Sequence, residues 1–185
     1  MIKDARSLQV GWSAGLGRCL GVLLVTLSAL LMGGCVQQAA PAPAVIRDGA
    51  PPWDAPRDTI SYIRAAGLPE LPLDDRTDPW VVAVVISIDG QAVQIPAHVG
   101  VDRPRAIQAP VHTHDTTGQV WLEGSGNREV TLAGFFAVWG VRFGQSCVGG
   151  ACGAVTVTAD GQVVGDPAAL VLWGTERVEV SVVTT

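Results

Sequence analysis

A run of β-branched residues at positions 81–88 limits the fold of this chain more than any other feature of its sequence. The run is Val-Val-Ala-Val-Val-Ile-Ser-Ile, and Asp89-Gly90 follows it. Val and Ile favour extended backbone, and an apolar run of this length is typical of a strand buried on both faces. Asp-Gly is a frequent two-residue hairpin turn. The pattern therefore predicts a buried strand, a tight turn and a second strand over residues 92–95.

Six more segments have the turn-bounded, β-branched pattern of strands. They are residues 111–114, 119–123, 154–158, 162–164, 169–173 and 178–183. Residues 159–168 also repeat the pattern of residues 88–97 at the Asp, Gly, Gln, Val, Pro and Ala positions. Two hairpins of one design are therefore expected, either in one sheet or in two facing sheets.

Two short helices are expected beside the strands. Residues 59–66 follow Asp58, a good N-cap residue, and stop before a Gly and a Pro. Residues 132–139 carry Leu, Phe and Trp at helical spacing, with Thr131 as the N-cap and Gly140 as the stop. An aromatic stripe of this kind more often fills the core under a sheet than binds a cofactor.

Composition narrows the class of protein. The chain has 185 residues, of which only 16% are charged, and it holds 22 Gly and 12 Pro. These values exclude a coiled coil, a charge-driven disordered protein and a basic nucleic-acid binder. We expect one mainly β domain (α+β by a strict count) over residues 58–185, built as a small β-sandwich or a grasp-like sheet with one or two short helices.

The N-terminal residues have the pattern of an export signal. Three basic residues precede an apolar run of 13 residues at positions 20–32, and small residues lead to Cys35. This predicts a signal peptide over residues 1–34. A transmembrane anchor, the rival interpretation, needs about 20 apolar residues. Leu31-Met32-Gly33-Gly34-Cys35 also resembles the bacterial lipobox, which would make Cys35 the lipidated first residue of the mature protein; an ordinary secretory signal is the alternative.

Residues 35–57 are rich in Pro and Ala and are expected to form an unfolded tether from the lipidated cysteine. Removal of residues 1–34 leaves nine Arg, no Lys and 16 acidic residues, a net charge of −7. An acidic domain is not attracted to nucleic acid or anionic lipid, so membrane contact must come from the acyl chains. We therefore expect a protein anchored to the outer face of the cytoplasmic membrane. The lysine-free composition suggests an actinobacterial source.

The chain has four cysteines; Cys19 lies in the predicted signal peptide and Cys35 would carry the lipid, so only Cys147 and Cys152 would face an oxidising exterior as thiols. Four residues, Val-Gly-Gly-Ala, separate them. In an exported chain such a pair is most often a structural disulfide, which we predict here. A metal-binding or redox-active dithiol is the alternative.

The histidines carry the most chemical information in the sequence. His112 and His114 are two residues apart, so on a strand they share one face with a spacing of about 7 Å. If a tight turn follows, His114 pairs with Gln119 and His112 with Trp121, and this register puts Glu123 on the histidine face. This register predicts a copper or zinc site of His112, His114 and Glu123, in which Asp115 orients one imidazole.

A structural role for the same residues remains open. In a His-Thr-His-Asp segment before Thr-Thr-Gly, Asp115 can cap backbone amides of the turn, and the histidines can be part of the packing. His98 follows Pro-Ala and is expected in a loop rather than at a metal.

Three blocks of the sequence resemble a widespread family of uncharacterised exported proteins from actinobacteria and some archaea, often with lipoprotein or membrane anchors. The blocks are residues 95–100, residues 111–123 with the His-Thr-His-Asp hairpin, and residues 131–143 with the Thr-Leu-x-x-Phe-Phe-x-x-Trp-Gly helix. The resemblance covers about residues 58–183 and implies an exported, anchored domain, but no particular activity.

His112, His114 and Asp115 match the histidine motif of that family. The family also has histidines at the start of its first strand and one after the turn, which would join the other two on one face as a transition-metal site requires. This chain has Trp80–Ala83 and Trp121 at those places.

Two functions are compatible with the sequence. The first is a non-catalytic, lipid-anchored binding or envelope domain whose partner is an envelope protein or a metal ion. The second is a copper- or zinc-binding lipoprotein that uses His112 and His114. An enzyme is the weakest reading, because the sequence contains no nucleophile elbow, no H-E-x-x-H and no phosphate-binding glycine loop.

Overall fold

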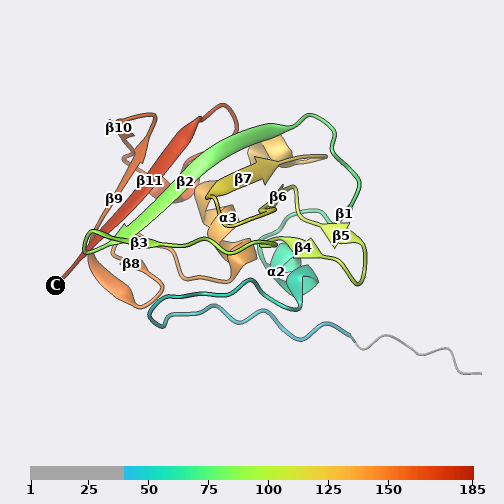
Figure 1. The fold of residues 1–185 in the computed structure, drawn as a ribbon, viewed down its shortest axis with the longest axis horizontal. Helices are drawn as coiled ribbons and strands as arrows, with labels where there is room; N and C mark the ends of the chain where they lie inside the picture. Colours follow the sequence, from blue (N-terminus) through green and yellow to red (C-terminus); the bar gives the residue numbers. More distant parts are fainter. Residues whose placement is uncertain (1–39) are drawn as a thin grey trace, which may run out of the picture. The chain divides into compact units, whose positions relative to one another are not determined.

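The β-branched run forms strand β2 (Trp80–Ile88), which lies inside an eight-stranded sheet (Figure 1). The computed structural model describes residues 40–185; the predicted signal peptide, the lipobox and Cys35 lie outside the described residues. Strand β11 (Arg177–Thr184) runs parallel to β2 along one edge, and β7 (Gln119–Leu122) runs antiparallel along the other. The described residues are 34% strand and 14% helix, which confirms the mainly β class.

The other strands extend this sheet on both sides or form a small second sheet. The large sheet has the order β10-β9-β11-β2-β7-β6, with β3 paired to β2 and β8 paired to β9; its further members are β3 (Gln91–Val93), β6 (Val111–His112), β8 (Cys147–Val148), β9 (Ala151–Ala159) and β10 (Gln162–Val163). The second sheet has the order β1-β5-β4, made of β1 (Leu71–Pro72), β5 (Ile107–Gln108) and β4 (Val101–Asp102).

Only one face of β2 is buried, which corrects the prediction of a strand covered on both faces. Val82, Val84 and Ile86 are at most 2% exposed, whereas Val85 on the opposite face is 40% exposed. The sheet therefore has a core face and an open face in this region. The β-branched residues on the open face fit the pleated backbone without being buried.

The two Asp-Gly turns have the same geometry and lie in one sheet, which decides between the two arrangements left open above. Asp89 and Asp160 both have φ of 49°, and the glycines that follow have φ of 78° and 80°. Positive φ at both central residues defines the type I′ hairpin turn. These turns join β2 to β3 and β9 to β10.

Residues 169–173 were predicted as a strand, and this prediction is wrong. The segment begins with the 3₁₀ helix η2 (Pro167–Ala169) and then forms only an isolated bridge between Val171 and Thr131. Its backbone instead follows the start of a helix: the Leu132 amide donates to the Leu170 carbonyl and the Leu172 amide to the Val130 carbonyl. The apolar residues that suggest a strand here serve to hold this crossing segment on the core.

The core is closed by α3 (Leu132–Trp139), which lies against one face of the large sheet (Figure 1). Its Phe and Trp side chains are fully buried. Thr131 is the N-cap, since its Oγ1 accepts from the Gly134 amide at 3.1 Å, and Gly140 ends the helix with φ of 71°, so both predicted caps are confirmed. The other helix, α2 (Thr59–Ala65), packs on α3, but the predicted N-cap Asp58 makes no side-chain capping bond.

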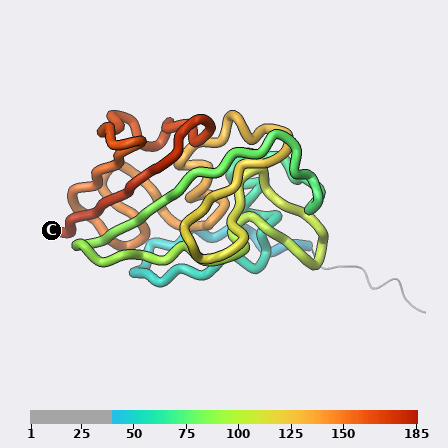
Figure 2. The backbone as a smooth tube through the Cα atoms, turned by 45° about the horizontal axis from the view of Figure 1, so that its top comes forward, coloured from blue at the N-terminus to red at the C-terminus, as the bar shows by residue number. Residues whose placement is uncertain are grey.

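Residues 45–57, which composition assigns to the tether, pack along the folded domain (Figure 2). The Trp53 side chain is 3% exposed and meets Trp139 edge-to-face with ring centroids 5.7 Å apart. The Arg47 amide donates to the Gly140 carbonyl at 2.8 Å. The folded unit therefore begins before residue 58 and includes residues from position 40 onward. No helix within residues 40–185 has the length and apolar character to cross a membrane.

Candidate metal site

The predicted hairpin register places the first histidine correctly. His112 ends β6 and pairs with Trp121 of β7, as expected. The strand is shorter than the predicted residues 111–114, so His114 lies in the turn and does not pair with Gln119. Gln119 begins β7 and pairs with β2 on its other side, at Ala83. The His114 ring nevertheless turns back onto the site, with its centroid 4.9 Å from that of His112.

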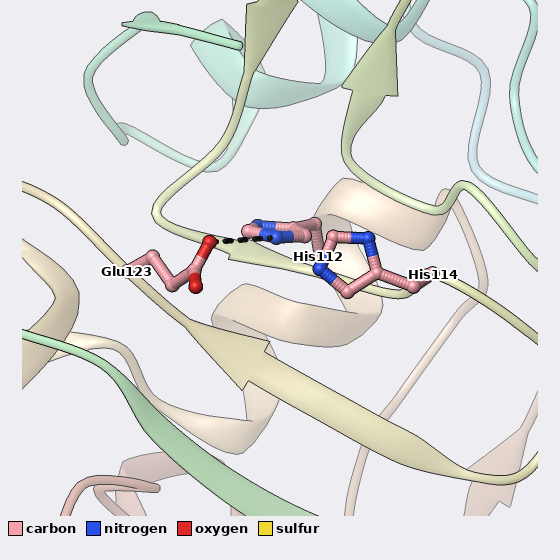
Figure 3. A group of neighbouring side chains, drawn as sticks. All are labelled: His112, His114 and Glu123. Carbon is pink, nitrogen blue, oxygen red and sulfur yellow. Dashed lines mark ion pairs between the residues drawn. The ribbon is translucent and has the colours of Figure 1, made fainter. Parts of the chain in front are cut away.

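Three side chains converge at the end of β6 and β7 (Figure 3). They are the predicted ligands His112, His114 and Glu123, and each offers one nitrogen or carboxylate oxygen within 4.8 Å of the other two. His112 is 0% exposed and Glu123 is 3% exposed, while His114 is exposed to solvent. The site therefore has two buried ligands, His112 and Glu123, which form its floor, and one ligand at the surface, His114.

The protonation of His112 follows from its surroundings. Its Nδ1 lies 3.1 Å from the carbonyl oxygen of Ala109, which can only accept a hydrogen bond. Nδ1 therefore carries the proton, and Nε2 carries a lone pair. Burial lowers the pKa of His112 to about 4, against a smaller raising effect of the Ala109 bond. The ring is thus neutral at pH 7, which is the form that binds a metal.

The lone pair of His112 faces a carboxylate oxygen. Nε2 lies 3.4 Å from Oε2 of Glu123, and within the described residues both atoms are buried without a hydrogen-bond partner. Each unsatisfied buried polar atom costs about 1–3 kcal/mol. Burial is also the main effect that raises the pKa of Glu123. Either a cation between the two atoms or a proton shared by them would remove this cost.

A loop over residues 75–78 lies beside the floor of the site. The Gly124 amide donates to the Thr77 carbonyl at 2.7 Å, and Nε2 of Gln108 donates to the Asp75 carbonyl at 2.6 Å. After burial and the charge of His114, Arg76 lowers the pKa of Glu123 and Asp75 raises it. Both charges therefore act at the site.

Asp115 has the role of a turn cap. Its Oδ1 accepts from the amide of Thr117 at 2.8 Å and from the Thr117 hydroxyl at 2.5 Å. The hydroxyl bond is the main reason that the pKa of Asp115 is lowered. The hydrogen bonds of Asp115 thus follow the turn-capping alternative, and the Nδ1 proton of His112 is held by the Ala109 carbonyl instead.

His98 lies in a loop, as expected, and is not part of the convergent group. It adopts a left-handed backbone with φ of 66°, and its amide donates to the Thr113 carbonyl at 2.9 Å. Burial lowers its pKa, with smaller effects of Arg103 and His114. His98 therefore stands near the site without contributing a ligand atom to it.

Of the two predictions that concern cysteines, the disulfide is confirmed, and the lipidation of Cys35 stays a prediction. Cys147 and Cys152 form the predicted disulfide across the β8–β9 hairpin, with a Cα–Cα distance of 4.1 Å. Neither thiol is therefore available as a ligand. Cys35 lies outside the described residues.

Two contributors to the site were missed by sequence reasoning. The Ala109 carbonyl selects the His112 tautomer, and the 75–78 loop brings in Arg76 and Asp75. Neither feature has a local signal, because a backbone carbonyl has no side-chain signature and the loop lies more than 30 residues away from the hairpin.

Comparisons with known proteins assign nothing further: no family model, no curated protein and no solved structure matches this chain.

Proposed function

We propose that this domain binds one zinc or copper(II) ion through Nε2 of His112, an imidazole nitrogen of His114 and the carboxylate of Glu123. The observation that carries the proposal is the buried lone pair of His112 Nε2 facing Glu123 Oε2, where neither atom has a hydrogen-bond partner in the part of the chain that the structure describes. Buried polar atoms are normally paired, and an unpaired couple of acceptors is the arrangement that a cation satisfies.

The donor set supports zinc or copper over harder ions. Two imidazoles and one carboxylate suit zinc and copper, whereas calcium and magnesium prefer oxygen ligands alone. Zinc binds these donors at about 2.0–2.2 Å, which places two ligands of a tetrahedral ion about 3.4 Å apart. The separation of His112 Nε2 and Glu123 Oε2 is 3.4 Å. The floor of the site therefore already has the spacing of an occupied one.

The third ligand needs a small movement. The ligand atoms lie within 4.8 Å of one another, whereas two ligands of one zinc ion are at most about 4.2 Å apart. His114 is the exposed member of the group, so rotation of its side chain closes the site without disturbing the core. The bond from His112 Nδ1 to Ala109 keeps the floor ligand in place, as outer hydrogen bonds do in metal sites.

Titration of the metal-free, detergent-extracted protein with Zn²⁺ and with Cu²⁺ in equilibrium dialysis tests the proposal. We expect one ion per chain. Replacement of a floor ligand in His112→Gln should weaken binding by about 100-fold or more, because even outer-shell changes cost 10- to 100-fold. His98→Gln is the matched control: it removes a nearby histidine outside the ligand group and should bind like the wild type.

The contrary result is equally clear. If the wild-type protein binds neither ion, His112 and Glu123 share a proton and the site is structural. If His112→Gln binds as tightly as the wild type, the ion is held elsewhere. Either outcome rejects the proposed function.

We also propose that the metal-binding domain is exported and anchored by lipid on Cys35 at the outer face of the cytoplasmic membrane. The support is the apolar signal pattern, the lipobox-like Leu-Met-Gly-Gly-Cys segment and a disulfide, a bond typical of exported proteins. Metabolic labelling with a clickable fatty acid should mark the wild type and not Cys35→Ala. A labelled Cys35→Ala protein, or full-length unprocessed chain in the cytosol, would contradict the anchor.

A further inference from the structure

The loop between the disulfide-bonded cysteines is closed at its base and has two glycines at its tip. Cys147 of β8 pairs with Cys152 of β9, with their Cα atoms 4.1 Å apart. The glycines are Gly149, which has a left-handed φ of 55°, and Gly150. A covalent link across a loop removes many of the conformations that the loop could otherwise adopt. The disulfide therefore holds the two glycines in one place.

Residues 47–53, which we call the strap, lie directly on these glycines. A Cβ on Gly149 would lie 2.2 Å from the Trp53 ring, so no side chain fits between the loop and the strap. The Gly150 amide donates to the Gly49 carbonyl at 2.7 Å. The position of the strap therefore depends on the position of the loop.

The remaining contacts of the strap are hydrogen bonds at its two ends. The Arg142 amide donates to the Arg47 carbonyl at 2.9 Å, and Nε1 of Trp139 donates to the Trp53 carbonyl at 3.2 Å. In the described part of the chain, the only β pairing of the strap is an isolated bridge between Arg47 and Val141. The strap is thus not a strand of a sheet, and the loop supports the middle of it.

The two halves of the disulfide differ in their access to solvent. Cys152 is exposed, whereas Cys147 is only 6% exposed. A disulfide is reduced when a thiolate attacks one of its sulfur atoms, and the rate depends on access to that sulfur. Sγ of Cys152 is therefore the point of attack, and Cys147 is the leaving thiolate.

We infer that reduction of this disulfide by an external dithiol releases the strap from the folded domain. One thiolate of the dithiol forms a bond to Sγ of Cys152, the S–S bond breaks, and Cys147 leaves as a thiolate that takes up a proton. The second thiolate then attacks the mixed disulfide, which frees the Cys152 thiol and oxidises the dithiol to an intramolecular disulfide. The two glycines are no longer held in one place, and the strap opens. None of the proposed metal ligands takes part.

Hydrogen exchange followed by NMR, on full-length, detergent-extracted protein with and without dithiothreitol, tests this inference. The Trp139 indole N–H and the Arg142 amide report the strap, because both donate to its carbonyls. The Val84 amide, which donates to the Gly118 carbonyl, reports opening of the sheet. Dithiothreitol should speed exchange at the two strap reporters by about 10-fold or more. Corrected for intrinsic rates, they should then exchange at least about 10-fold faster than Val84, as local opening requires.

Two variants reproduce the release without a reductant. Gly149→Ala places a Cβ against the Trp53 ring, so the strap reporters of the oxidised variant should exchange about 10-fold or more faster than those of the oxidised wild type. Gly161→Ala is the matched control, since Gly161 also has a left-handed φ but no neighbour within 4 Å of an added Cβ. It should keep wild-type exchange at the strap. Cys147→Ser combined with Cys152→Ser should exchange rapidly whether or not dithiothreitol is present.

Three results would overturn the inference. The first is that both cysteines resist alkylation by iodoacetamide in dithiothreitol until urea is added, because the disulfide is then closed to reductants in the folded protein. The second is unchanged exchange at the strap reporters after reduction. The third is exchange of these reporters no faster than that of Val84 in the reduced protein, which means that the strap opens only when the domain unfolds. All three leave the metal site untouched, and failure of the protein to bind Zn²⁺ or Cu²⁺ leaves this inference untouched.

Discussion

At the scale of single residues, the arrangement of His112 and Glu123 favours metal binding but lowers the stability of the metal-free protein. Their facing acceptor atoms are buried and have no hydrogen-bond partner among residues 40–185, which costs free energy when no cation is bound. A pair selected only for stability would be a donor and an acceptor. Strain of this kind is typical of functional sites, where local rules of packing are broken for a ligand.

Glu123→Gln should therefore separate the effect of this residue on stability from its effect on metal binding. The glutamine amide can donate to the His112 Nε2, so the metal-free variant should be as stable as the wild type or about 1 kcal/mol more stable, while metal binding is lost. Urea unfolding in EDTA gives the first value and dialysis with Zn²⁺ the second. A variant that is clearly less stable would mean that the Glu123 carboxyl donates a proton to His112 in the metal-free protein.

Acid should destabilise the metal-free protein through His112. Burial lowers its folded pKa to about 4, below the ordinary value of 6.5, so the unfolded chain takes up the proton first. The stabilising contribution is fully present above pH 6.5 and is lost as the pH falls towards 4, by about 3 kcal/mol in total. Glu123 acts in the opposite direction, because its raised pKa favours the folded state as the carboxyl is protonated.

The measurement that isolates His112 is a comparison of urea unfolding between the wild type and His112→Gln, both in EDTA, from pH 7 to pH 4. The Glu123 contribution is present in both proteins and largely cancels. The stability difference between them should shrink towards acid pH. Parallel curves would show that the His112 proton is bound as easily in the folded protein as in the unfolded chain.

At the scale of elements, β6 is positioned by residues 99–101, which pack so closely against it that Gly100 has no room for a side chain. Thr113 and Val99 are joined by a hydrogen bond from the Thr113 amide to the Val99 carbonyl, and the Ala109 amide donates to the Gly100 carbonyl at 2.7 Å. A Cβ on Gly100 would lie 2.4 Å from the Val111 carbonyl oxygen and 3.1 Å from the His112 Cβ. The direct contact of this segment with β6 therefore determines where His112 stands.

Gly100→Ala should lower both stability and metal affinity. The left-handed φ of 75° costs an alanine about 1 kcal/mol, and the clash with β6 adds about 1–3 kcal/mol. Gly161→Ala is the matched control, since Gly161 has φ of 80° but no neighbour within 4 Å of an added Cβ. It should lose only the backbone contribution and should bind zinc normally. Equal losses in the two variants, by urea unfolding and dialysis, would argue against the close packing.

Which elements the sequence could predict depends on how local their determinants are. The Asp-Gly turns and the Thr131 and Gly140 caps are set by neighbouring residues, and they were predicted correctly. The pairing of His112 with Trp121 followed from a short turn. The prediction for residues 169–173 was wrong because an apolar segment has the same pattern whether it pairs in a sheet or crosses the start of a helix. The effect of Arg76 on the pKa of Glu123 depends on the tertiary fold, which no local pattern predicts.

At the scale of the whole molecule, the segment before α2 is part of the core rather than a free leader. Trp53 docks on the loop between the disulfide-bonded cysteines, where a Cβ on Gly149 would lie 2.2 Å from the Trp53 ring. The Gly150 amide donates to the Gly49 carbonyl at 2.7 Å, and Nε1 of Trp139 donates to the Trp53 carbonyl at 3.2 Å. Residues 49–53 of the predicted tether are therefore packed against the folded domain.

A chain that starts at residue 58, the boundary that composition suggests, should fail to fold cooperatively. It lacks Trp53, whose loss costs about 3–5 kcal/mol, and it leaves the buried Trp139 Nε1 without its acceptor, which costs about 1–3 kcal/mol more. Together these losses approach the entire stability of a typical domain, about 5–15 kcal/mol. A chain that starts at residue 40 keeps all of these contacts and should melt within a few degrees of the longer protein.

Thermal melts followed by near-ultraviolet circular dichroism distinguish the two truncations, because the signal depends on the packed tryptophans. Trp53→Ala in the full-length chain provides the link between them: it should fold, but with a loss of stability between those of the two truncated chains, since Arg47 still holds the segment to Gly140. If the chain from residue 58 melts like the chain from residue 40, the segment contributes no net stability. The contacts of Trp53 would then be those of a tether resting on the domain surface, and the boundary suggested by composition would be the energetic one.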